Sequence, residues 1–150
     1  MISLLQTDST HPDFRALVAA LDAELLIRDG DIHAFYAQFN TIEAIKHAII
    51  AYVDDEAVAC GAIKAHSADA VEIKRMYTTP EHRGKGLARK ILEALERWAA
   101  ELQYEKCILE TGVNQPEAIA LYYKTGYTRI PNYGPYAGLD TSLCFEKNVR

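Results

Sequence analysis

The most constraining feature of the sequence is an amphipathic segment flanked by two apolar, strand-like segments. Apolar residues recur at helical spacing from Leu87 to Leu102. The stretch "VEIKRMYTT" precedes this helix over residues 71–79, and "KCILETG" follows it over residues 106–112. Two strands that are joined through a long helix are expected to lie parallel, and such crossovers are right-handed. The sequence therefore predicts a β-α-β unit in the middle of the chain.

The remaining segments predict further strands and helices. One helix is predicted after Thr10 and Pro12, and a short helical piece over residues 31–39. Strands are predicted over residues 2–7, 47–53, 57–65 and 142–147, and another helix over residues 115–125 that ends at Gly126. Short turns join the strands between residues 47 and 79, which indicates an antiparallel meander.

These elements predict a single domain over residues 1–150, because no repeat, low-complexity tract or linker divides the chain. The fold class is α+β. We expect a central mixed, mostly antiparallel twisted sheet of six to seven strands, with about four helices on both faces.

Composition excludes several classes of protein. Hydrophobic residues make up 49% of the chain and charged residues 25%, as in soluble globular proteins. The apolar runs are too short to cross a bilayer and the first residues lack a signal-peptide pattern, so a cytoplasmic protein without a membrane partner is expected. A net charge of −5 argues against nucleic acid as a partner. The three cysteines are interpreted as buried free thiols, and the five histidines show no ligand spacing, so no metal is predicted.

The stretch "PEHRGKGLARK" (80–90) gives the central helix an unusual start. Helices prefer acidic residues in the first turn, whereas Arg83 and Lys85 lie here together with Gly84 and Gly86. Glycines allow backbone conformations in which successive N–H groups converge on an anion. A phosphate or pyrophosphate site is therefore one interpretation, and a simple tight turn is the other. The motifs of P-loop NTPases and of Rossmann dinucleotide sites are absent from the sequence.

Two separate motifs resemble the GCN5-related N-acetyltransferase (GNAT) family. "RGKGLA" (83–88) matches its R/Q-x-x-G-x-G/A signature, and "AIALYYKTGY" (118–127) resembles its A-I-x-L-Y-x-K-x-G-F/Y helix and turn. The resemblance implies a fold in which acetyl-CoA, as the acyl donor, lies in a V-shaped gap between two parallel strands. The following residues would then contact the coenzyme: Arg83, Gly84, Lys85, Gly86, Leu87 and Ala88 around the pyrophosphate, and Met76, Tyr77 and Thr78 through main-chain groups near the thioester and the pantetheine arm.

The family often carries Asn seven residues before its conserved tyrosine, where it touches the pantetheine. This chain has Gln115 at that position, and Gln115 offers the same amide groups on a longer stem. A contact between Gln115 and the pantetheine is therefore predicted, although the residue departs from the family pattern.

The resemblance also implies two catalytic residues. Tyr122 matches the tyrosine whose hydroxyl serves as general acid near the coenzyme sulfur; the alternatives are that Tyr122 only packs the helix, or that Tyr123 takes the role. Glu72 matches the position of a catalytic glutamate in some members, and regular alternation places it on the same strand face as Met76. As a base, Glu72 would remove the amine proton. Its alternatives are a solvated carboxylate or a pair with Lys74.

The acyl acceptor is not identified by the sequence. Tyr133 and Tyr136 are candidate walls of its pocket, with loop packing as the alternative, and Arg75 is a candidate partner for a carboxylate. The function predicted from the resemblance is N-acetyl transfer from acetyl-CoA to a primary amine of a small molecule or peptide, in a ternary complex. The alternatives are an acyl-CoA-binding sensor without turnover and an interaction domain without a cofactor. Relatives commonly form homodimers, which is the expected assembly if this chain is not a monomer.

Overall fold

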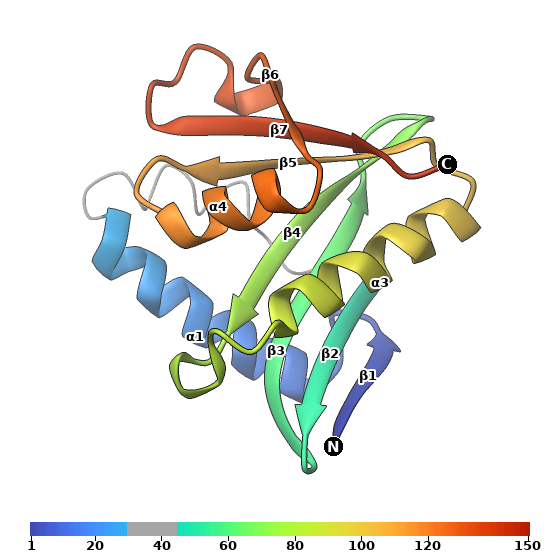
Figure 1. The fold of residues 1–150 in the computed structure, drawn as a ribbon, viewed down its shortest axis with the longest axis vertical. Helices are drawn as coiled ribbons and strands as arrows, with labels where there is room; N and C mark the ends of the chain where they lie inside the picture. The colour runs from blue at the N-terminus through green and yellow to red at the C-terminus, as the bar shows by residue number, and fades with distance from the viewer. Residues whose placement is uncertain (30–44) are drawn as a thin grey trace.

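The computed structural model describes residues 1–29 and 45–150, so the helical piece predicted over residues 31–39 lies outside the described residues. The described strands form one seven-stranded sheet with the order β1-β2-β3-β4-β5-β7-β6 (Figure 1). All pairs of neighbouring strands are antiparallel except β4 and β5. The predicted fold class is therefore confirmed.

The N-terminal half follows the predicted meander. The elements are β1 (Ile2–Thr7), α1 (Pro12–Asp29), β2 (His47–Val53), β3 (Glu56–Ala65) and β4 (Ala70–Thr78). Some of these strands alternate apolar with polar residues, and others are apolar almost throughout. The short connections between β2, β3 and β4 allow only antiparallel pairing. The apolar side chains of α1 that recur at helical spacing, such as Phe14 and Val18, are buried against the sheet.

The predicted crossover connects β4 to β5 (Lys106–Gly112) through the short helix η2 (Pro80–His82) and helix α3 (Leu87–Glu101). Residues 70–72 of β4 pair in parallel with residues 106–108 of β5, and no further pairs follow along these strands. Because β4 continues to Thr78 and β5 to Gly112, their carboxyl-terminal halves diverge. The V-shaped gap that the family resemblance implies therefore opens after Glu72.

The C-terminal part adds α4 (Pro116–Lys124), β6 (Thr128–Ile130), η3 (Gly134–Tyr136) and β7 (Ser142–Asn148). Strand β7 lies between β5 and β6 and pairs with both. The three-residue strand β6 was not predicted as a separate segment, since it is too short to show an alternating pattern. With β6, the number of strands reaches the upper limit that was predicted.

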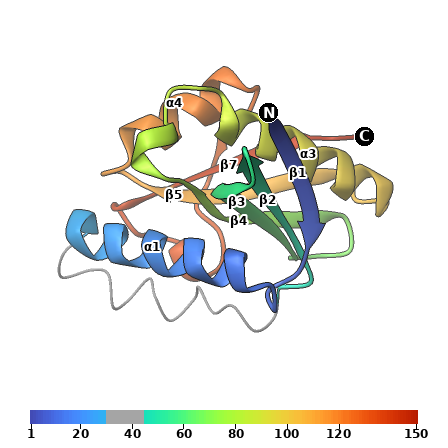
Figure 2. The ribbon, with the colours of Figure 1, turned by 90° about the horizontal axis from the view of Figure 1, so that it is seen from below.

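Helices cover both faces of the sheet. Helix α1 lies on one face, and α3 and α4 lie on the other (Figure 2). Each face has its own hydrophobic core: α3 packs through Leu87, Ile91 and Leu95 on one side, and α1 packs through Phe14 and Leu17 on the other. The described residues thus contain three α-helices, against about four predicted for the whole chain.

Candidate active site

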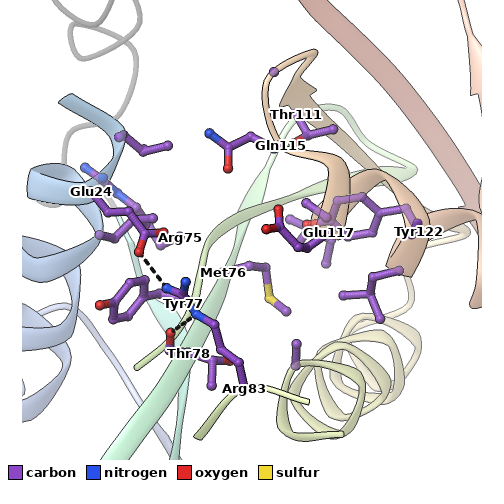
Figure 3. A pocket seen from close by; sticks show the side chains of 18 of the residues that line it. Glu24, Arg75, Met76, Tyr77, Thr78, Arg83, Thr111, Gln115, Glu117 and Tyr122 are labelled. Atoms are coloured by element: carbon purple, nitrogen blue, oxygen red, sulfur yellow. Dashed lines mark hydrogen bonds and ion pairs between the residues drawn. The ribbon is translucent and has the colours of Figure 1, made fainter. Parts of the chain in front are cut away.

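A cleft of about 730 Å³ occupies the gap between β4 and β5 and continues to the start of α3. Figure 3 shows its side chains: β4 runs through the middle, α1 forms one side, and Tyr122 and Glu117 of α4 lie on the other. The predicted site residues that line this cleft are Glu72, Arg75, Met76, Tyr77, Thr78, Arg83, Gly84, Gly86, Leu87, Ala88, Gln115, Tyr122 and Tyr136. Lys85 and Tyr133 are not among the described lining residues.

The glycine turn leaves open space in front of α3. Gly84 and Gly86 have φ angles of +78° and +80°, which residues with a side chain rarely adopt. A Cβ atom added to either glycine would meet nothing within 4 Å. Gly86 is also the N-cap of α3, and the first turn of α3 contains no acidic residue. The positive end of the helix therefore faces the cleft without a negative partner from its own sequence, an arrangement that suits an anion.

Arg83 connects the glycine turn to α1. Its Nε donates to the carbonyl oxygen of Thr78 at 2.9 Å, and its Nη2 donates to Glu24 Oε1 at 2.7 Å. The guanidinium also lies over the ring of Tyr77, 5.6 Å from the ring centre. The Arg83 charge is thus held at the mouth of the cleft, between β4 and α1. Glu24, the partner of Arg83, lines the same cleft.

A β-bulge interrupts β4 in the middle of the cleft. The register between β3 and β4 shifts between Cys60 and Ala62, so that one residue of β3, Gly61, lies opposite two residues of β4. Arg75, in the bulge, has a φ of +60°. The extra residue reverses the alternation of side chains from this point onward.

The predicted common strand face of Glu72 and Met76 is wrong for this reason. Ile73 and Met76 pack in the core beneath α3, whereas Tyr77 packs in the core beneath α1. Glu72, as the neighbour of Ile73, therefore points to the α1 face, opposite to Met76. A regular strand would have placed Glu72 and Met76 together. Both residues still line the cleft, because the cleft passes through the gap in the sheet.

Tyr122 lies on α4, on the face opposite to Glu72. Tyr122 is buried, with 5% of its surface exposed. Burial raises the pKa of Tyr122, and the charge of Glu110 raises it further, so the phenol is a neutral hydrogen-bond donor. Tyr123 is 52% exposed, and its ring packs edge-on against Phe145. Tyr122 is the one of these two tyrosines that lines the cleft.

Glu72 is the last residue of β4 that pairs with β5, so it lies where the strands begin to diverge. Its side chain is 14% exposed, and Oε2 accepts a hydrogen bond of 2.8 Å from the hydroxyl of Tyr133. Lys74 Nζ lies 3.7 Å from Oε1. The pair with Lys74, one of the alternatives for Glu72, is thus present, and Glu72 is not a solvated strand carboxylate. Burial lowers the pKa of Lys74, and the charge of Glu72 opposes that shift.

Gln115 lies immediately before α4 and faces the cleft. Its Oε1 accepts a hydrogen bond of 2.8 Å from Arg28 Nη1, and Arg28 also pairs with Glu117 at 3.1 Å. The Gln115 Nε2 atom is buried and has no hydrogen-bond partner among the described residues. An unsatisfied buried amide is costly, so this N–H suits a carbonyl oxygen of a bound molecule.

Sequence reasoning missed Glu110, a carboxylate that lines the cleft, and Asp22, the partner of the cleft residue Arg75. Glu110 lines the cleft from β5 and accepts a hydrogen bond of 2.9 Å from Ser142 Oγ. Asp22 pairs with Arg75 at 2.7 Å. The signal for Glu110 was available, because a lone carboxylate in the apolar strand "KCILETG" is seldom buried without a partner. Asp22 carried no such signal within α1.

Other expectations concern metals, membranes and thiols. Within residues 1–29 and 45–150, no cluster of three or more His, Cys, Asp or Glu side chains could hold a metal ion. No helix in the same ranges is long and apolar enough to cross a membrane. Cys60, Cys107 and Cys144 are buried free thiols, as predicted. Burial raises the pKa of both Cys60 and Cys107 to about 12, which makes them poor nucleophiles.

Known proteins resemble this chain in sequence and in fold. An IAA acetyltransferase of Azospirillum brasilense is 40% identical over 91 residues, which are 60% of this chain and 60% of that relative's length. The crystal structure of a Klebsiella pneumoniae protein assigned to the acyl-CoA N-acyltransferases is 35% identical, with a TM-score of 0.82 over 100% of this chain and 99% of that chain. An N-acetyltransferase of Thermoplasma acidophilum, in complex with coenzyme A, shares the fold at a TM-score of 0.71 and 17% identity, over 99% of both chains.

The family model described as "Acetyltransferase (GNAT) family" matches residues 11–127. This range includes α1, the bulged strand β4, the glycine turn and α4, and thus most of the elements that form the cleft. The sequence match, the sheet with its single parallel pair and the cleft at the point of divergence agree with one another. The chain belongs to the GNAT acetyltransferase family.

Proposed function

We propose that the chain is an N-acetyltransferase that moves an acetyl group from acetyl-CoA to an amine by direct transfer in a ternary complex. The observation that carries this proposal is the continuity of one cleft from the open glycine turn to the gap between β4 and β5. One end of the cleft suits a diphosphate, and the other end holds Tyr122 and Glu72. The curated relative and the two solved structures named above are also acyltransferases by name.

The donor end fits coenzyme A on two observations. The space in front of Gly84 and Gly86 would be filled by side chains at other residue types, and the backbone amides of residues 83–88 would bind a diphosphate there. The unpartnered Nε2 of Gln115 suits a carbonyl of the pantetheine arm. Met76, Tyr77 and Thr78 would offer main-chain groups beside the thioester, since β4 pairs with no residue of β5 after Glu72. Acetyl-CoA supplies the activated acyl group.

The acceptor end must deliver a neutral amine. An aliphatic amine has a pKa of about 10.4, so only about one molecule in a thousand is unprotonated at neutral pH. Glu72 is the proposed base: it lies at the point of divergence, with its carboxylate oriented by Tyr133 and paired with Lys74. Glu72 would take one proton from the ammonium group before the attack; the carbon–nitrogen bond then forms, the carbon–sulfur bond breaks to release the thiolate, and the second nitrogen proton leaves to solvent.

Tyr122 would act on the sulfur from the opposite face of the sheet. Its pKa lies above the ordinary value of about 10, whereas a thiol has a pKa near 8.5, so complete proton transfer from the phenol to a thiolate is uphill. We therefore assign Tyr122 the role of a hydrogen-bond donor that stabilises the developing thiolate, with solvent as the final proton source. The positions of Glu72 and Tyr122 imply that the amine enters from the α1 face and that the coenzyme binds on the α3 and α4 face.

Two measurements test this proposal. Coenzyme A at 100 times its dissociation constant should stabilise the protein by about 2.7 kcal/mol, which a thermal shift detects. Release of thiol from acetyl-CoA should then depend on an added amine, and Glu72→Gln and Tyr122→Phe should slow it. A thermal shift without transfer to any amine would favour an acyl-CoA sensor instead. The absence of any shift would contradict the donor site itself.

A further inference from the structure

Arg75 has a strained backbone on the acceptor side of the cleft. Its φ of +60° is uncommon for a residue with a side chain and is energetically unfavourable. The bulge turns the side chain toward α1, where it is 5% exposed, and the residue lines the cleft. Such strain persists only where the surrounding structure enforces it, and it concentrates at functional sites.

The Arg75 guanidinium is satisfied along one edge. Nη1 donates to Asp22 Oδ1 at 2.7 Å, whereas the buried Nε has no acceptor among the described residues. A buried N–H of a charged group that lacks a partner destabilises the structure, because its lost hydration is not replaced. The Nε–H belongs to a planar fork of donors that matches the two oxygens of a carboxylate. The Nε–H of Arg75 thus lacks an acceptor in the described part of the chain, and a second anion could supply one.

Charges suited to an amine lie in the same part of the cleft. Glu72 and Glu110 line it from the two diverging strands. The side chain of Lys74 is 7% exposed and lies 3.7 Å from Glu72; burial lowers the pKa of Lys74, and the charges of Glu72 and Glu110 oppose that shift. The acceptor end therefore contains both positively and negatively charged side chains, which come from β4 and β5.

We propose that the acceptor is an amine that carries a carboxylate close to its nitrogen, as an α-amino acid does, with the carboxylate on Arg75 and the amine beside Glu72. This inference rests on the proposed function and narrows its acceptor. A zwitterion of this size pairs with both signs of charge, and it satisfies the Arg75 Nε–H. A polyamine leaves that donor unpaired and places further positive charge beside Arg75 and Lys74, which is unfavourable at short range.

Matched acceptors that differ by one carboxylate test the inference. We would compare alanine with ethylamine, leucine with isoamylamine and phenylalanine with 2-phenylethylamine, with kcat/KM expressed per unprotonated amine. The amino acid of at least one pair should be about tenfold better or more, as expected for a charge-assisted hydrogen bond. Arg75→Gln should abolish this preference. Arg97→Gln, which removes an exposed arginine outside the cleft, should leave it intact.

Binding provides a readout that does not depend on turnover. Calorimetry with coenzyme A present should detect the preferred amino acid on the wild-type protein and binding at least about tenfold weaker on Arg75→Gln. Arg75→Lys keeps the charge but loses the fork, so it should also bind more weakly; this variant replaces Arg75→Gln if the latter does not fold. Equal use of both members of every pair would overturn the acceptor class and leave acetyl transfer intact. Transfer to no member of any pair would overturn it as well, and the coenzyme thermal shift then shows whether the donor site survives.

Discussion

Tyr133 donates a hydrogen bond of 2.8 Å to Oε2 of Glu72, although the two residues are 61 positions apart in the chain. Tyr133 comes just before η3, and its ring lies edge-on to that of Tyr136, with the ring centres 5.8 Å apart. Tyr136 lines the cleft. The segment between β6 and β7 therefore provides Tyr136 to the wall of the cleft and Tyr133 as the residue that orients the proposed base.

We expect Tyr133→Phe to lower kcat by about tenfold to a hundredfold, because a hydrogen bond to a charged group contributes about 1.5–3 kcal/mol. Burial and the charge of Glu72 raise the pKa of Tyr133, so the hydroxyl is a donor at every working pH. The KM for acetyl-CoA should hardly change, since Tyr133 is not among the described residues that line the cleft. Steady-state kinetics with the donor and the acceptor varied in turn would measure both effects.

Tyr123→Phe is the matched control, since it removes the same hydroxyl from an exposed position on α4. Its kcat should equal that of the wild type. If Glu72→Gln is nearly inactive but Tyr133→Phe is not impaired, the positioning role of Tyr133 is wrong and the base assignment stands. The double variant Glu72→Gln, Tyr133→Phe should be no slower than Glu72→Gln alone.

Tyr122 predicts a pH dependence with a definite sign. Because burial raises its pKa above the ordinary value of about 10, the phenol stays protonated from neutral pH to about pH 10. Tyr122→Phe should therefore lower kcat by about a hundredfold, and this factor should be the same at every pH in the range. A pH–rate profile of both proteins measures this. An alkaline loss of activity below pH 10 that is present in the wild type and absent from Tyr122→Phe would contradict a neutral donor.

Much of this fold could be predicted because its signals are periodic and local. The helical spacing in residues 87–102 and the strands around it required the parallel crossover, and Gly84 and Gly86 indicated the anion site at its start. The bulge at Arg75 could not be predicted, because the pattern of "VEIKRMYTT" does not show which residue is the extra one. The extra residue is seen only in the pairing register between β4 and β3. Gly61 in the apolar strand "AVACGAIKA" was a partial signal, because a glycine inside a strand often marks a bulge.

The contacts that cross the cleft were also outside the reach of sequence patterns. Glu24 with Arg83, Arg28 with Gln115, and Tyr133 with Glu72 each join segments far apart in the chain. Polar side chains at these positions are compatible with a solvated surface, and only the packing of α1 and of the segment before β7 against the gap brings the partners together.

Gly86 and Gly126 separate the effect of a ligand site from that of backbone strain. Both have positive φ angles, +80° and +99°, so an alanine at either position should cost about 1–2 kcal/mol of stability. Of these two glycines, Gly86 lines the cleft and Gly126 does not. We expect Gly86→Ala to weaken coenzyme A binding about tenfold, and Gly126→Ala to leave it unchanged. Calorimetric titration of both variants, with urea unfolding as the stability measure, gives the comparison; equal loss of affinity in both would mean that strain alone is responsible.

Gly61 lies opposite the bulge and gives it room. A Cβ at this position would lie 2.5 Å from Met76 Sδ, 2.8 Å from Ile91 Cγ2 and 3.0 Å from Leu95 Cδ1. Met76 is flexible, but Ile91 and Leu95 are fixed in the core beneath α3. We expect Gly61→Ala to lower the free energy of unfolding by about 1–3 kcal/mol, as overpacking does, measured by urea unfolding.

The same substitution should reach the donor site, because the methyl group would displace the side chain of Met76, a residue of the bulge whose main chain is proposed to contact the thioester arm. Gly61→Ala should therefore also weaken coenzyme A binding. In a Met76→Ala background the nearest clash is removed, so Gly61→Ala should cost at least about 0.5 kcal/mol less than it does alone. If the unfolding free-energy costs of the two substitutions are strictly additive, Ile91 and Leu95 rather than Met76 resist the methyl group. The destabilisation by Gly61→Ala would then not act through the bulge.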